Sequence, residues 1–177
     1  MSRELQVIAP SGYDPAIAPW IWAMEEARRR TLALVSGLDQ RTLDWQGPDG
    51  LENAIGSLLY HIALVEMSWL FLDVQLQEFP AEVKADFPYE MATGGRVTPV
   101  RNVPLAVHLN RLSRSREVFL NAFRGMPVEE WHRLRTPDAT PYSVTPAWAM
   151  FHLLEHEAGH AAQISALKTR AARHFGD

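Results

Sequence analysis

The segment HEAGH carries two histidines four residues apart. His156 and His160 lie in an alanine-rich stretch without proline, so on a helix both imidazole rings project from one face. This spacing is the most common way in which a helix supplies two ligands to a transition metal. The pair therefore indicates a metal site, and a third ligand decides its chemistry.

The same five residues also fit the H-E-x-x-H pattern of zinc proteases, in which Glu157 would be the catalytic base. The residues after His160 contain no Glu, and Ala166 stands where the metzincin pattern requires its third histidine. No segment alternates like a strand that could hold an extended peptide. We therefore expect no protease activity.

His61 is the best candidate for a third ligand. It lies on the inward stripe of a helix whose apolar residues recur at helical spacing: Ile55, Leu58, Leu59, Ile62, Val65 and Trp69. A single histidine among apolar neighbours is more often bonded to a carbonyl or to water. Together with His156 and His160, it predicts a metal site with three imidazole ligands and at least one open position, as in catalytic sites.

Four further polar residues lie near these histidines in the sequence. Glu157, Glu66 and Glu155 are candidates to orient a ligand or to act as a general base, and each is equally well explained as part of a solvated helix face. His152 stands one turn before His156. It is a fourth member of the histidine row, a ring that lines the pocket beside the metal, or an ordinary half-buried histidine.

Composition limits the class of protein. With 177 residues, 47% of them hydrophobic, a single domain over residues 1–177 is expected, with residues 1–13 as a flexible segment. The chain has no cysteine, so any metal is held by His, Asp or Glu, and nitrogen ligands suit zinc, nickel or iron.

The charge pattern indicates which partners the protein is expected to bind. The chain has 17 basic and 21 acidic residues without a basic patch, so nucleic acid is not an expected partner. We expect the arginines at 28–30, 111, 114 and 116 to lie on solvated helix faces.

No signal peptide or membrane span is expected, because the most apolar stretch is interrupted by Glu66 and Asp73. A cytoplasmic homodimer is expected, since small bundles rich in Trp and Leu seldom cover every apolar face alone.

Hydrophobic periodicity and helix-capping residues predict four helices. They run from about residue 14 or 19 to 36, from 53 to 77, from 104 to 125 and from 145 to 174. Prolines and glycines at 80, 88, 94, 95 and 99 keep the connection 78–103 out of helix, and the prolines at 127, 137, 141 and 146 do the same for 126–145. The first connection is long enough to cross a bundle. The predicted fold is an all-α four-helix bundle with a long crossover between the second and third helices, which lets these two helices run parallel.

The motifs HIALVE at 61–66 and HxxxHAAQI at 156–164, with L-D-W and a Gly/Pro loop before the first, resemble the DinB/YfiT-like superfamily. The family often ends this motif as H-x-G-Q-I, where this chain has Ala161-Ala162-Gln163-Ile164. The resemblance implies an up-down-down-up bundle. It also implies a divalent zinc or nickel ion held by His61, His156 and His160.

Some members of that family are thiol-dependent enzymes that use mycothiol or bacillithiol. The resemblance therefore implies a metal-dependent enzyme that uses an open three-histidine site for thiol-dependent transfer or hydrolysis of a small molecule. Glu157 is the candidate catalytic residue, and a low-molecular-weight thiol is the candidate cofactor. The alternative is a non-catalytic, metal-stabilised binding or stress-response module, in which the fourth metal position is closed.

Overall fold

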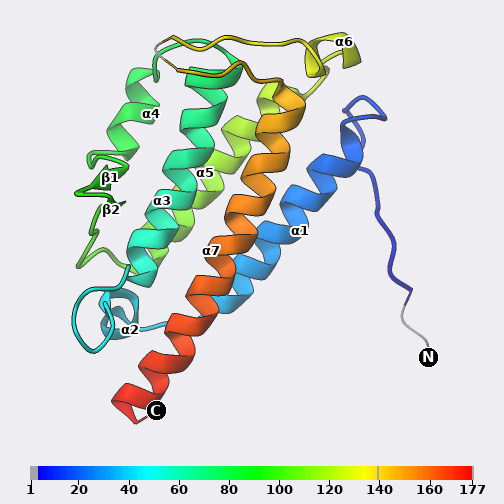
Figure 1. Ribbon diagram of the computed structural model, residues 1–177. Coiled ribbons are helices and arrows are strands. Elements are labelled where there is room, and N and C mark those ends of the chain that lie inside the picture. Colours follow the sequence, from blue (N-terminus) through cyan, green and yellow to red (C-terminus); the bar gives the residue numbers. More distant parts are fainter. Residues whose placement is uncertain (1–3, 139, 177) are drawn as a thin grey trace.

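Four long helices dominate the computed structural model, which describes residues 4–138 and 140–176. They are α1 (Ala18–Val35), α3 (Ile55–Ser68), α5 (Leu105–Phe123) and α7 (Pro146–Phe175), and a π-helical segment, Trp69–Val74, continues α3 (Figure 1). The all-α prediction is confirmed, and each predicted helix begins and ends within a few residues of its expected position. Residues 4–13 form no helix or strand. The first three residues of the expected flexible segment lie outside the described part.

Local sequence explains where the longest helix begins and ends. The Thr145 side chain accepts a hydrogen bond from the backbone N–H of Trp148 at 3.1 Å, and Pro146 occupies the first turn, where its missing N–H costs nothing. Gly176 ends the helix in the left-handed conformation, with φ 78°. The N-terminal cap thus fixes the position of Trp148 on α7.

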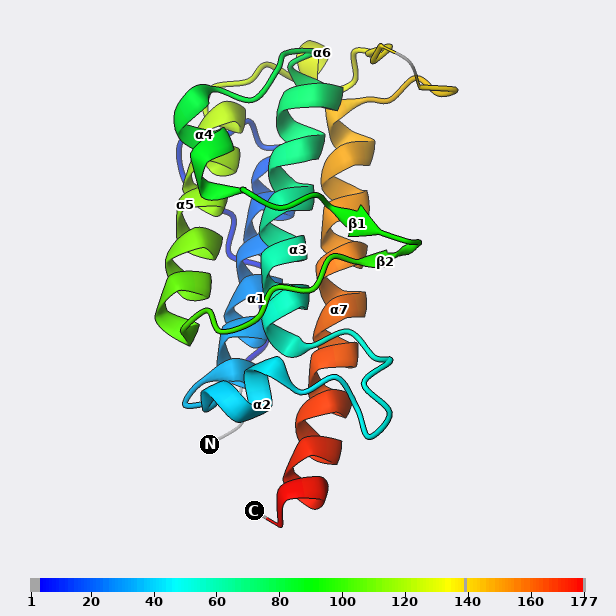
Figure 2. The ribbon, with the colours of Figure 1, turned by 90° about the vertical axis from the view of Figure 1, so that its left-hand side faces the viewer.

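The helices run in two directions. In Figure 1, α3 and α5 rise toward one end of the molecule, whereas α1 and α7 run the opposite way, and Figure 2 shows the same arrangement from the side. The most extensive packing joins α3 to α5, α1 to α7, and α3 to α7. The helices α3 and α7, which carry the three predicted ligands, are therefore direct, antiparallel neighbours.

Short elements occupy the connections. They are three short helices, α2 (Gln40–Asp44), α4 (Ala81–Asp86) and α6 (Val128–Trp131), and a hairpin of β1 (Ala92–Thr93) with β2 (Arg96–Val97). The expectation that both proline-rich connections lack helix is wrong for α4 and α6. In each case the proline stands just before the first helical residue, where no backbone hydrogen bond is lost. The hairpin contacts α3, so part of the crossover lies along this helix (Figure 2).

The stretch Ile55–Val74 is long and apolar enough to cross a membrane, but most of it is buried inside the bundle. Even its two acidic residues, Glu66 and Asp73, are buried. Such burial on all sides is typical of the central helix of a soluble bundle. The expected cytoplasmic location stays a prediction.

His108 on α5 is a buried titratable residue outside the metal site. Its side chain packs against Gly56 of α3, where an added Cβ would lie only 3.1 Å from the ring Nε2. Within the described residues its Nδ1 has no hydrogen-bond partner. Burial lowers the pKa of His108 to about 4, and the charge of Arg111 acts in the same direction. The folded protein therefore holds this ring neutral.

We expect the replacement His108→Leu to make the protein less sensitive to acid. At pH values between the ordinary histidine pKa of 6.5 and the lowered pKa of about 4, His108 binds a proton in the unfolded chain but not in the folded chain. The stability from His108 is thus complete above pH 6.5 and falls by about 3 kcal/mol as the pH drops to 4. Urea unfolding at pH 7 and pH 4.5 measures the difference. His132→Leu, at an exposed position, should lose as much unfolding free energy between pH 7 and pH 4.5 as the wild type does. An equal loss in His108→Leu would contradict the conclusion that the folded protein holds His108 neutral.

Candidate metal centre

The three predicted histidines meet between α3 and α7. The Nε2 atom of His156 lies 3.2 Å from that of His61 and 3.1 Å from that of His160. The potential ligand atoms of the three side chains all lie within 4.8 Å of one another. The antiparallel packing of α3 on α7 thus brings His61 to a pair that is 95 residues away in the sequence.

All three rings favour the neutral form. Burial, aided by His160 and His61, lowers the pKa of His156 to about 3. Burial and His160 lower the pKa of His61 to about 4, and burial also lowers the pKa of His160. Neutral imidazole is the form that binds a metal ion, so the site is in the binding state at neutral pH.

The distances from the Nε2 of His156 to its two neighbours fit a shared metal ion better than hydrogen bonds among the rings. A neutral Nε2 carries either one proton or one lone pair, so the Nε2 of His156 cannot make good hydrogen bonds to both neighbours. An ion about 2.0–2.1 Å from each nitrogen in tetrahedral geometry would place the nitrogens about 3.3 Å apart. The separations of 3.1 and 3.2 Å are close to this value. The donor set fits a divalent ion such as zinc or nickel.

Gln163 orients one of the three ligands. Its Oε1 lies 3.0 Å from the Nδ1 of His160, and because an amide oxygen can only accept, Nδ1 carries the proton. The Nε2 lone pair of His160 is then free to point at the ion, in the manner of residues that fix a metal-bound histidine from outside. Gln163 belongs to the motif HxxxHAAQI, so this contact gives its glutamine a physical role.

The Glu157 carboxylate is engaged by two arginines. Its Oε1 accepts a hydrogen bond from Nε of Arg28 at 2.8 Å, and its Oε2 accepts one from Nη2 of Arg116 at 2.8 Å. The residue is buried, with only 2% of its surface exposed, so the alternative that it lies on a solvated face is wrong. Both carboxylate oxygens are engaged by guanidinium groups, and this arrangement does not favour a role as general base.

Glu66 completes a buried network of two arginines and two glutamates, which we call the arginine network (Arg28, Arg116, Glu66 and Glu157). Arg28 lies 3.2 Å and Arg116 2.5 Å from the Glu66 carboxylate, and the Ser115 hydroxyl donates to it at 3.1 Å. Burial alone would raise the pKa of Glu66, but the two guanidinium groups lower it. Two positive and two negative charges thus neutralise each other inside the bundle.

The expectation that Arg28 and Arg116 lie on solvated faces is wrong, since each is only 5% exposed. The side of the bundle between α1 and α5 is wide, and these two side chains bridge it. Arg28 donates to the carbonyl of Leu112 on α5 at 2.6 Å, and Arg116 donates to the carbonyl of Met24 on α1 at 2.7 Å. Long side chains with several donors can span this space and satisfy backbone carbonyls on both helices.

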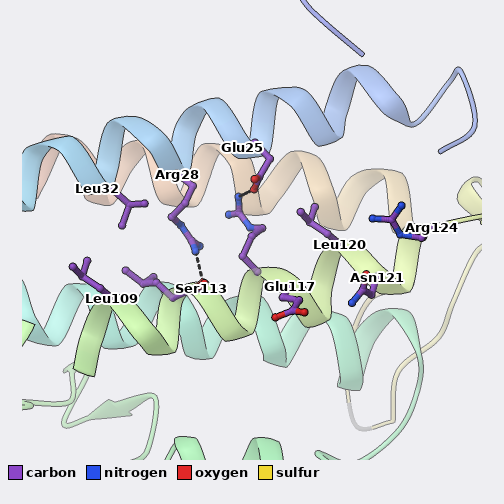
Figure 3. Close-up of a pocket in the computed structure, with 11 residues that line it drawn as sticks. Glu25, Arg28, Leu32, Leu109, Ser113, Glu117, Leu120, Asn121 and Arg124 are labelled. Atoms are coloured by element: carbon purple, nitrogen blue, oxygen red, sulfur yellow. Dashed lines mark hydrogen bonds and ion pairs between the residues drawn. The ribbon is translucent and has the colours of Figure 1, made fainter. Parts of the chain in front are cut away.

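A groove of about 440 Å³ borders the arginine network on this side (Figure 3). Figure 3 shows Glu25 of α1 at its edge, where its carboxylate accepts a hydrogen bond from Arg116 at 3.1 Å. None of the three histidines lines the groove. It is therefore separate from the metal centre.

His152 and Glu155 lie beside the metal centre but outside its ligand group. The Nδ1 of His152 is 3.1 Å from Oε1 of Glu155. The ring centroid of His152 is 6.0 Å from that of His156, and it stacks on Trp148 at 5.1 Å. The structure therefore leaves His152 out of the group of potential ligands and places it, half-buried, beside the His156 ring.

Comparison with known protein families gives a match over most of the chain. The DinB superfamily matches residues 23–164, which is more than half of the chain and includes all three histidines. No curated protein matches the chain.

Proposed function

Because the chain belongs to the DinB superfamily, we propose that it is a metal-dependent enzyme that carries out thiol-dependent transfer or hydrolysis of a small molecule. The observation that carries this proposal is the convergence of three neutral imidazoles, whose Nε2 atoms lie 3.1 and 3.2 Å apart, on one point between α3 and α7. Three histidines without a fourth protein ligand are the donor set of catalytic rather than structural zinc sites.

The residues have separate roles in this proposal. His61, His156 and His160 hold the ion, and Gln163 keeps the proton of His160 on Nδ1. A bound divalent ion lowers the pKa of a coordinated thiol or water and polarises a substrate carbonyl. The chain has no cysteine, so the sulfur nucleophile comes from a low-molecular-weight thiol. A cytoplasmic homodimer with zinc or nickel is part of the proposal.

One observation favours the alternative of a non-catalytic, metal-stabilised module. Both carboxylate oxygens of Glu157, which directly follows His156 in the sequence, are engaged by Arg28 and Arg116. In the proposed enzyme, the thiol must instead lose its proton to solvent or to a buffer base. A measurable turnover therefore decides between the two functions.

We expect the metal-loaded protein to accelerate the reaction of a thiol with 1-chloro-2,4-dinitrobenzene. The reaction forms a carbon–sulfur bond, breaks the carbon–chlorine bond and releases chloride and the thiol proton. Mycothiol, bacillithiol, glutathione and cysteine should be compared, with product formation followed by absorbance against the uncatalysed rate. A chelator and His156→Ala should each abolish the acceleration. Metal-loaded protein that accelerates none of these reactions, and does not hydrolyse small esters, would favour the non-catalytic module.

A further inference from the structure

An apolar pocket lies at the end of the bundle where α3 ends and α7 begins. Its volume is about 400 Å³, and its lining carries no charged side chain. Ser143 and Thr145 contribute to the wall, and the other lining residues are Trp69, Leu134, Tyr142, Val144 and Trp148. This volume and lining are in the range of sites for small organic ligands.

The aromatic walls of the pocket hold one another in place. Trp69 stacks on Tyr142, with ring centroids 6.0 Å apart and planes 21° apart, and lies 5.3 Å from Trp148. The Tyr142 hydroxyl donates to Oδ1 of Asp73 at 2.7 Å, and the cap at Thr145 fixes the backbone of Trp148. The pocket thus offers flat faces at fixed positions, which suit stacking with another ring.

These rings are also unusually accessible. Trp148 is 47% exposed and Tyr142 is 41% exposed, although a large apolar side chain gains free energy when it is removed from water. A cluster of exposed aromatic side chains around a concavity is typical of a binding site. A neutral aromatic ligand would bury these faces without leaving any charge unpaired.

The pocket stands at a defined distance from the histidines. Trp69 follows His61 by eight residues, and Trp148 precedes His156 by eight residues. Because α3 and α7 are antiparallel, Trp69 and Trp148 lie at the same height along the bundle axis, and His61 and His156 lie together at another height. The two heights differ by about 12 Å along the helix axes, at 1.5 Å per residue. His152 lies between the levels, with its ring centroid 4.8 Å from that of Trp69 and 6.0 Å from that of His156.

We propose that this pocket binds the planar, uncharged aromatic group of the substrate, and that the substrate's reactive group reaches from there past His152 toward the three histidines. The second part of this inference rests on the proposed function. The occupant is a compound of one or two fused rings with a polar arm long enough to cover about 12 Å.

The binding part is tested with 2-naphthol and metal-free protein in chelator. In ¹⁵N-labelled protein, the indole N–H signals of Trp69 and Trp148, among six tryptophans, should shift and saturate with a single dissociation constant. Trp148→Ala should weaken binding about fivefold to tenfold, because a stacking face is lost, and Trp148→Phe should restore most of it. Cyclohexanol should cause no saturable shift.

Phe151→Ala is the matched control. Phe151 is 44% exposed on the same helix but does not line the pocket, so this variant should bind 2-naphthol as the wild type does. Unchanged binding in Trp148→Ala, or shifts spread over all six indoles, would overturn the proposal. A third outcome would also overturn it: the wild type is a dimer that does not bind 2-naphthol, and Trp148→Ala is a monomer. A second copy of the chain, and not a ligand, would then cover the pocket.

The link to the metal centre is tested with Co²⁺ alone as the added ion and Zn²⁺ as the diamagnetic reference. Relaxation of the bound 2-naphthol protons should be faster with Co²⁺, and the enhancement should correspond to a distance of about 12 Å. Equal relaxation with the two ions would overturn the link. If 2-naphthol binds as expected but thiol turnover is absent, the proposed function fails while the pocket assignment stands.

Discussion

The replacement His156→Ala is expected to remove nearly all the divalent metal from the purified protein. His156 is the central ligand, with its Nε2 within 3.2 Å of that of His61 and 3.1 Å of that of His160. Since loss of a residue that only orients a ligand costs 10–100-fold in metal affinity, loss of a ligand itself should cost more than about 100-fold. His61→Ala should have the same effect. Elemental analysis of protein without a histidine tag measures the metal content, with one ion per chain expected in the wild type.

His152→Ala is the matched control, because His152 lies one turn away on the same helix but outside the ligand group. It should retain one ion per chain. A chelator should lower the melting temperature of the wild type and of His152→Ala but not that of His156→Ala, because an ion that binds only the folded state stabilises it. Equal metal content in His61→Ala, His156→Ala and the wild type would show that the histidines do not form a metal site.

The replacement Glu157→Gln is expected to destabilise the protein by about 3–5 kcal/mol, because it leaves a buried positive charge without its partner. The amide keeps the shape of the side chain but cannot balance Arg28 and Arg116, which would share Glu66 alone inside the bundle. For a chain of this size, the loss corresponds to a fall in melting temperature of about 6–20 °C. Thermal and urea unfolding at pH 7 measure it.

Glu155→Gln is the control for this prediction. Glu155 lies on the same helix two residues earlier and is exposed, so its replacement should change stability by less than about 0.5 kcal/mol. Glu157→Gln should also keep one metal ion per chain when it is folded, since Glu157 contacts arginines and not the histidines. Loss of the metal together with unchanged stability would instead assign Glu157 to the metal centre.

Local sequence signals were sufficient to predict the helices and to single out the three histidines that the structure brings together. Apolar residues at helical spacing, with Pro146 and Thr145 at the start of α7, set the ends of the helices because caps and periodicity act within a few residues. The spacing of His156 and His160 places both on one face of a helix whatever surrounds it. His61 was identified only in combination with these two histidines.

The arginine network was missed, although a signal for it is present. Arg28 continues the buried row Ile21, Met24, Thr31 and Val35 on α1, and Arg116 lies between the buried residues Leu112 and Phe119 on α5. The position of each arginine in an apolar row thus predicts a buried side chain, whereas its residue type predicts an exposed one. Residue type favours the surface, since arginine is almost never buried unless it is paired, and the carboxylates that pair with these arginines lie on α3 and α7, far away in the sequence.

The sequence by itself therefore determined the helices, the chemistry of the donors and the family, because each follows from residue types and short spacings. Only the tertiary structure decided which side chains of different helices contact one another. It placed His61 against His156 and Glu157 against Arg28 and Arg116, and it brought Trp69 and Trp148 to one level eight residues from the ligands. Such pairings depend on how antiparallel helices align lengthwise and rotate about their axes, and these are set by the packing of all side chains together.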